Sequence, residues 1–141
     1  MMANVNYLSI FLAAVAAWLF GGAYYTALSK PWMAAQGMTM EQCKAEMAGK
    51  SKVQMYLPFV LAFVGALIMS WAMYGMLVHL KTFTVRAGTI SGAIIWFGFV
   101  LTSMTVNNAF HGKRPMLTVI DSIHWLGGLL IIGAIVGWMG Q

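Results

Sequence analysis

Four long apolar segments constrain this chain more than any other feature of its sequence. They cover approximately residues 5–28, 55–80, 87–110 and 115–139. At a rise of 1.5 Å per residue, a helix of about 20 residues crosses a hydrocarbon core about 30 Å thick. Hydrophobic residues make up 61% of the 141-residue chain and charged residues 8%, whereas about a quarter of the residues in a soluble protein are charged. The sequence therefore predicts an all-α membrane protein: one domain, residues 1–141, folded as a four-transmembrane-helix bundle with short loops.

Small residues recur at four-residue spacing in each predicted span. In lipid there is little hydrophobic force between helices, so small side chains that allow close backbone contact drive their association. Each motif alone is weak support for a particular helix pair, but together they predict a compact bundle. The motifs are Ala13, Ala17 and Gly21 in the first span, Ala62, Ala66 and Ser70 in the second, Gly88 and Gly92 in the third, and Gly133 and Gly137 in the fourth.

The one longer loop covers residues 33–54. Thr39 followed three residues later by Gln42 is typical of a capping box that opens a helix, and Gly49 is suited to end it. A short helix on the membrane surface and a plain loop both remain open for this segment.

Prolines indicate where three of the helices begin or end. Pro31 is predicted to end the first span, and Pro115 to start the fourth. Pro58 is expected in the first turn of the second span, where a missing N–H is tolerated. The three prolines therefore agree with the span limits.

The distribution of Lys and Arg predicts the orientation in the membrane. Residues 29–54 contain four Lys and the HGKRP turn contains one Lys and one Arg, whereas the opposite side has only Lys81 and Arg86. By the positive-inside rule both termini are expected in the periplasm, in a bacterial inner membrane; dual insertion stays open. The net charge of +5 predicts contact with anionic lipid headgroups. Nucleic acid is not expected as a partner, because no soluble domain offers a basic face with interleaved aromatics.

Several polar residues fall where the third and fourth spans meet the HGKRP turn. Because the turn makes these spans antiparallel neighbours, residues at similar distances from it lie at similar depth. Asp121 and His124, three residues apart, share one face of the fourth helix. The candidate residues for binding a ligand or proton are Asp121, His124, Asn107, Asn108, Tyr25 and Arg114.

Two interpretations of these residues remain open. Ionisable groups inside a membrane are candidates for function, and an Asp and a His at one depth could bind a cation or pass a proton. The same side chains could instead form hydrogen bonds that fix helix register, each worth about 0.6 kcal/mol on average. We expect no catalytic residues, no metal site and no cofactor, so an enzyme is not predicted.

Three stretches of the sequence resemble one known family. NYLSIFLAAVAAWLFGGAYYTALSKPWM, NNAFHGKRP and DSIHWLGGLLIIGAIVGW are similar, in order and spacing, to the bacterial integral-membrane family called domain of unknown function 1761. The resemblance covers nearly the whole chain. It implies a small four-span inner-membrane protein and assigns no activity.

Two functions are compatible with these observations. The first is binding or translocation of a small ligand, ion or proton through a polar pocket between the first, third and fourth spans, in a protein that forms oligomers. The second is an accessory subunit that packs against a larger respiratory, photosynthetic or transport complex through its small-residue motifs and aromatic side chains.

Overall fold

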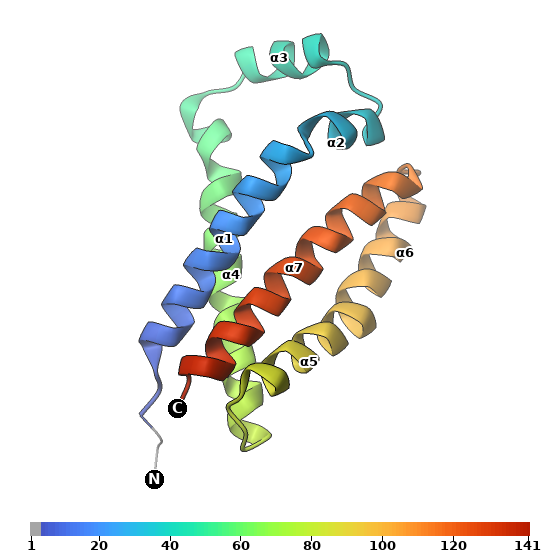
Figure 1. The fold of residues 1–141 in the computed structure, drawn as a ribbon. Helices are drawn as coiled ribbons and strands as arrows, with labels where there is room; N and C mark the ends of the chain where they lie inside the picture. The colour runs from blue at the N-terminus through green and yellow to red at the C-terminus, as the bar shows by residue number, and fades with distance from the viewer. Residues whose placement is uncertain (1–3) are drawn as a thin grey trace.

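The computed structural model describes residues 4–141 and confirms the predicted all-α fold with four helices long and apolar enough to span a membrane. The four spans run in alternating directions, so the start of α1 and the end of α7 lie at one end of the molecule and the longer loop lies at the other (Figure 1). The third span is a single helical rod built from α5, a π-helical segment η1 and α6. The elements are α1 (Tyr7–Ala27), α2 (Ser29–Ala35), α3 (Met40–Ala48), α4 (Lys52–His79), α5 (Val85–Ile95), η1 (Trp96–Leu101), α6 (Thr102–Phe110) and α7 (Pro115–Met139).

The start of α4 differs from the sequence prediction. Ser51 and Gln54 form a capping box, in which the Ser51 side chain accepts from the Gln54 backbone and the Gln54 side chain accepts from the Ser51 backbone. The helix therefore begins at Lys52, three residues earlier than expected. The prediction that Pro58 lies in the first turn was wrong, because Pro58 lies inside α4.

The first span ends earlier than Pro31. Leu28 has φ −103° and ψ 19°, outside the helical region, and separates α1 from α2. Pro31 lies in the first turn of α2, where helices tolerate a residue without an N–H. The break changes the direction of the chain, so that α2 lies beside the first turns of α7 (Figure 1).

The short helix in the longer loop is confirmed as α3. Thr39 and Gln42 form the predicted capping box, and Gly49 is the C-cap residue. None of its residues is buried, and the helix lies across the end of the bundle, beyond α2 (Figure 1).

Helix α7 is the centre of the bundle. It packs against α1, α4 and α5, and it is the most buried of the four spans, whereas the third span is the least buried. The main hydrophobic core lies where these helices converge, in the half of the molecule that contains the termini. Its buried residues are Ile10, Ala13 and Ala17 of α1, Met73, Tyr74 and Leu77 of α4, and Ile132 and Val136 of α7.

The predicted small-residue motifs account for the closest helix contacts. A Cβ atom added at Gly88 of α5 would overlap the carbonyl oxygen of Gly133 in α7. A Cβ atom added at Gly133 would likewise overlap the carbonyl oxygen of Gly88. A Cβ atom added at Gly92 would lie 2.7 Å from the carbonyl oxygen of Leu129. The two GxxxG motifs therefore pack against each other. In α4, by contrast, Ala62 is exposed, and only Ala66 and Ser70 of its motif are buried.

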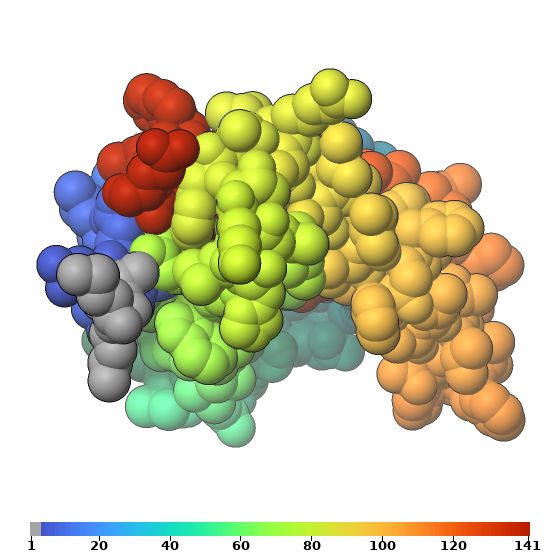
Figure 2. Space-filling view, turned by 90° about the horizontal axis from the view of Figure 1, so that it is seen from below, coloured from blue at the N-terminus to red at the C-terminus, as the bar shows by residue number. Residues whose placement is uncertain are grey.

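The π-helical segment η1 was not predicted. A π turn adds one residue to a turn of the helix, so it rotates the following residues by about 100° relative to a continuous α-helix. Gly88 and Gly92 face α7 before the segment, and Thr105 and Asn108 face it afterwards. Trp96 and Leu101, the first and last residues of η1, also face α7 although they are five residues apart. Beyond η1 the third span changes direction (Figure 1), and its orange end projects from the molecule (Figure 2).

Candidate functional site

Asp121 of α7 is the acceptor for two aromatic side chains. The Tyr25 hydroxyl of α1 donates a hydrogen bond to Asp121 Oδ1 at 2.7 Å, and Trp32 Nε1 of α2 donates to the same oxygen at 3.2 Å. All three side chains are half-buried. The break at Leu28 makes this arrangement possible, because it brings an indole from α2 over the carboxylate while Tyr25 approaches from α1.

Tyr24 joins α1 to the backbone of α7 next to the carboxylate. Its hydroxyl donates to the Ile120 carbonyl oxygen at 2.7 Å. A small hydrophobic cluster of Ala35, Leu117 and Ile120 lies beside it, with Tyr24, Tyr25, Leu28 and Trp32 packed around the cluster. The polar contacts to Asp121 and Ile120 are therefore held by rigid packing rather than by loop residues.

The His124 side chain lies among four aromatic rings. Its ring stacks on Phe20, with the ring centroids 6.1 Å apart and the planes 3° from parallel. Tyr25 is closest, at 4.8 Å between centroids, followed by Trp125 at 4.9 Å and Tyr24 at 5.7 Å. Tyr25 thus contacts both Asp121 and His124, because its hydroxyl donates to the Asp121 carboxylate and its ring packs on the His124 ring.

Two glycines provide the space for this aromatic cluster. A Cβ atom at Gly21 of α1 would lie 2.8 Å from His124 Nε2, and one at Gly127 of α7 would overlap the Phe20 ring. Gly22, next to Gly21, has no atom within 4 Å of the equivalent position. The last small residue of the predicted α1 motif therefore accommodates a histidine rather than a helix backbone.

The Nδ1 atom of His124 is buried and makes no hydrogen bond with any residue that the structure describes, from 4 to 141. A neutral imidazole has one nitrogen that donates and one that accepts. A buried polar atom that is left unpaired costs about 1–3 kcal/mol, and such atoms call for an explanation. His124 therefore offers an unused proton donor or acceptor position inside the bundle.

The structure does not bring all six candidate residues together. Asp121, His124 and Tyr25 form one cluster. The Asn108 amide instead donates to Thr118 Oγ1 at 2.9 Å, and Arg114 Nη1 donates to the Ala34 carbonyl oxygen at 2.8 Å.

Asn107 is exposed. A continuous α-helix from Trp96 would place residues 103, 106 or 107, and 110 toward α7. The π segment rotates Asn108 inward instead. Asp121, His124 and Tyr25 gather between α1, α2 and α7.

Sequence reasoning missed three residues near the site. Phe20 stacks on His124, and Trp32 binds Asp121. Trp96 of η1 donates from Nε1 to the Ser122 carbonyl oxygen at 2.6 Å. No spacing rule within one helix connects α1, α2 or η1 with α7, so the sequence offered no signal for these contacts.

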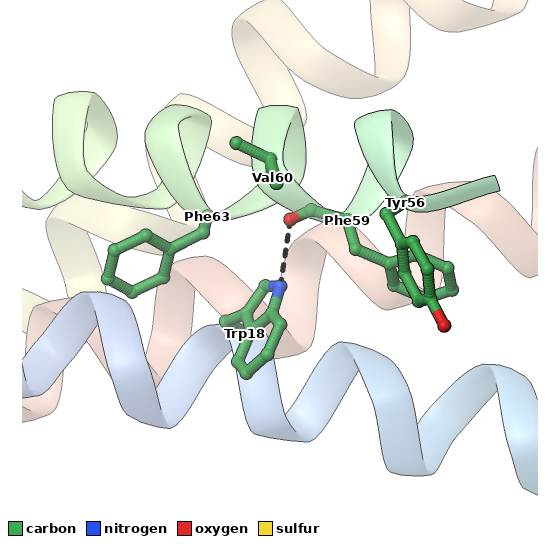
Figure 3. Close-up of a pocket in the computed structure, with 5 residues that line it drawn as sticks. All are labelled: Trp18, Tyr56, Phe59, Val60 and Phe63. Atoms are coloured by element: carbon green, nitrogen blue, oxygen red, sulfur yellow. Dashed lines mark hydrogen bonds between the residues drawn. The ribbon is translucent and has the colours of Figure 1, made fainter. Parts of the chain in front are cut away.

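Two surface grooves lie away from Asp121. The first is apolar, has a volume of about 420 Å³ and lies between α1 and α4. There Trp18 projects from α1 toward α4 and donates from Nε1 to the Phe59 carbonyl oxygen at 3.1 Å, beside Phe63, Val60 and Tyr56 (Figure 3). The second groove, of about 320 Å³, lies between α6 and α7.

Residues 8–137 match the family described as protein of unknown function (DUF1761). The chain belongs to this family. No curated protein and no solved structure matches the chain. The predicted resemblance is thus confirmed over nearly the whole length, and the family assigns no activity to the cluster around Asp121.

Proposed function

We propose that this member of the DUF1761 family is a membrane protein that binds a proton at Asp121 and His124, on the cytoplasmic side of a bacterial inner membrane. The single observation that carries the proposal is the unpaired, buried Nδ1 atom of His124. A buried nitrogen with no role would cost about 1–3 kcal/mol when left unpaired, so its presence favours a use for it. Ionisable residues inside spans are costly, at about 2.5–3.5 kcal/mol for an Asp at a helix centre, and usually mark functional sites.

The packing around His124 favours a proton over a larger ligand. Phe20, Tyr24, Tyr25 and Trp125 surround the imidazole, and Gly21 lies against its Nε2. A proton needs no additional space, whereas any other ligand would have to displace an aromatic ring. The faces of these rings also attract a cation, so they would stabilise the imidazolium form.

Asp121 supplies the counter-ion and the route of entry in this proposal. It lies one helical turn nearer the HGKRP turn than His124, about 4.5 Å along the axis. Its carboxylate binds Trp32 of α2 and Tyr25 of α1, so it connects the end of the bundle with the interior. Beyond His124, α7 enters the apolar core around Ile132 and Val136. This arrangement supports a proton that binds from one side of the membrane, rather than a proton that crosses the membrane through a single chain.

NMR of the protein labelled with ¹⁵N-histidine, in lipid nanodiscs, would test the proposal. Spectra are recorded from about pH 8 to pH 5, the range in which histidines act as switches, and we expect the His124 ring to become imidazolium as the pH falls. Asp121→Asn keeps the oxygen that accepts from Tyr25 and Trp32 but removes the charge, so it should change the His124 titration. The matched control is Asn107→Ala, which alters an exposed amide in the same half of the molecule.

The result against the proposal would be equally clear. A His124 ring that stays in one neutral form over this pH range, in both the wild type and Asp121→Asn, would show that His124 only fills space between aromatic rings.

The second candidate function is an accessory subunit. The third span is the least buried of the four and exposes Phe97, Phe99 and Phe110, a face that another membrane protein could cover. Gentle solubilisation followed by native mass analysis tests this function. Stoichiometric partner proteins would support it, and a homo-oligomer or monomer alone would contradict it.

A further inference from the structure

The groove between α6 and α7 is separate from the Asp121 site. It has a volume of about 320 Å³ and lies in the half of the molecule near the HGKRP turn. Thr105 and Ala109 line it from α6, and Thr118 and Ser122 from α7. Lys113 borders one end, in the turn, and Leu101 borders the other, at the end of η1. The groove is therefore a mostly apolar channel with a cation at its outer end.

The open form of this groove follows from the residues on its two walls. Thr105 and Ala109, and Thr118 and Ser122, are small residues at four-residue spacing, as in the glycine contact between α5 and α7. Threonine and serine still carry side chains, so the backbones cannot approach as closely as they do at glycine. The bond from Asn108 to Thr118 joins the helices near the turn, and Trp96 joins them near η1 through the Ser122 carbonyl. Between these two contacts the groove stays open.

The dimensions and position match one leaflet of a membrane. Leu101 and Phe110, the last residue of α6, are nine residues apart, which corresponds to about 14 Å along a helix. Half of a hydrocarbon core about 30 Å thick is about 15 Å. A chain that lies in the groove would therefore extend from the headgroup level at Lys113 to approximately the bilayer midplane at Leu101.

We propose that this groove binds one acyl chain of an anionic phospholipid, with Lys113 paired to the lipid phosphate. Lys113 is exposed at the end of the groove. Its neighbour Arg114 is already committed, because its guanidinium donates to the Ala34 carbonyl oxygen and lies against Gly37. The Asp121 carboxylate accepts from Tyr25 and Trp32 of α1 and α2, so it belongs to another interface of α7. The charge at the mouth of the groove is thus positive.

Native mass spectrometry of the purified protein, after delipidation in detergent, tests this proposal. Phosphatidylglycerol and phosphatidylcholine with identical acyl chains are added separately, and the bound lipid is counted. We expect tighter binding of phosphatidylglycerol, and Lys113→Gln should weaken it about five-fold, the usual contribution of one cation near an anionic lipid surface. Lys44→Gln is the matched control, because Lys44 is an exposed cation of α3 at the same end of the bundle.

A second pair of variants tests the groove itself. Ala109→Phe places a ring in the groove and should reduce the binding of both lipids at least five-fold, whereas Ala62→Phe on the exposed face of α4 should not. Unchanged lipid binding in Ala109→Phe would overturn the assignment of the groove. Equal binding of the two lipids, with no effect of Lys113→Gln, would overturn the role of Lys113. Displacement of phosphatidylglycerol by inorganic phosphate would show an anion site without an acyl chain and would also overturn the proposal.

Discussion

Helix α7 contacts the third span in two different ways along its length. Near the termini, Gly88 and Gly133 bring the backbones of α5 and α7 into direct contact. Near the HGKRP turn, α6 and α7 are joined by the bond between Asn108 and Thr118 and leave a groove of about 320 Å³. In both halves of α7 small residues recur at four-residue spacing. The two helices touch in the half near Gly133, which we call the closed half, and leave a groove in the half near the HGKRP turn, which we call the open half.

The difference shows how one helix can combine stability with a site. The glycine contact and the main hydrophobic core occupy the half of α7 that contains Ile132 and Val136. The ionisable residues of α7, Asp121 and His124, lie in the other half, where aromatic rings and single hydrogen bonds hold the helices together. Regions with fewer close backbone contacts open more easily, and binding sites are usually drawn from such regions.

Among the variants that test this difference, Gly88→Ala should lower the free energy of unfolding most. The new methyl group would overlap the Gly133 carbonyl oxygen, a backbone atom that cannot move without shifting α7. We expect the free energy of unfolding to fall by about 3 kcal/mol or more, at the upper end of overpacking costs. Reversible unfolding in mixed micelles, followed by circular dichroism, would measure the loss.

The matched control for this change is Gly98→Ala. Gly98 lies in the same span, in η1, and an added Cβ there has no atom within 4 Å. It should be neutral, or stabilising by up to about 1 kcal/mol, because alanine favours a helix more than glycine does. Equal losses from both variants would contradict the distinction between a closed and an open half.

Insertion of one alanine after Ser103 should have the second largest effect. The added residue would rotate the rest of α6 by about 100°, because each residue of an α-helix turns the chain by that angle. Asn108 would then turn away from Thr118, and we expect a loss of about 1–2 kcal/mol from interhelical hydrogen bonds and packing. The rotation is measured by cross-linking cysteines in a Cys43→Ser background. The pair at 108 and 118 should react in the chain without the insertion, and the pair at 107 and 118 only after it.

Most of the fold could be predicted from the sequence because lipid imposes simple rules. The fourth span was expected at 115–139 and is found at Pro115–Met139. Glycines in GxxxG motifs were expected at close helix contacts, and both motifs are found there. The start of α4 was placed three residues late because Ser51 and Gln54, polar residues outside the apolar segment, begin the helix.

Only part of the candidate site could be predicted. Asp121 and Tyr25 were expected in one cluster and share a hydrogen bond. Asn107 was expected there too, since a regular 3.6-residue period carries no information about an inserted π turn. The Phe20 ring beside His124 also escaped prediction, because Phe20 faces His124 only through the space that Gly127 leaves. Such contacts depend on the relative rotation of two helices, which periodicity within one helix does not determine.

Gly21→Ala tests the open half of α7 directly and should cost less than the preceding changes. Its methyl group would lie 2.8 Å from His124 Nε2 and would push the imidazole against the surrounding rings. We expect a loss of about 1 kcal/mol, at the low end of overpacking costs, because a side chain can move where a backbone cannot. The His124 ring signals in NMR should also shift. Gly22→Ala, with no atom within 4 Å, should change neither quantity.

Trp96→Phe should have the smallest effect, although Trp96 lies where the closed and open halves meet. Phenylalanine keeps the aromatic ring but cannot donate to the Ser122 carbonyl oxygen, a bond of 2.6 Å in the native protein. We expect a loss of about 0.6 kcal/mol in unfolding free energy, the average for a hydrogen bond between membrane helices. Trp71→Phe, on the exposed face of α4, should have no effect. If both variants unfold like the wild type, the hydrogen bond from Trp96 does not help to hold η1 against α7. The glycine contact alone would then determine where the two helices separate.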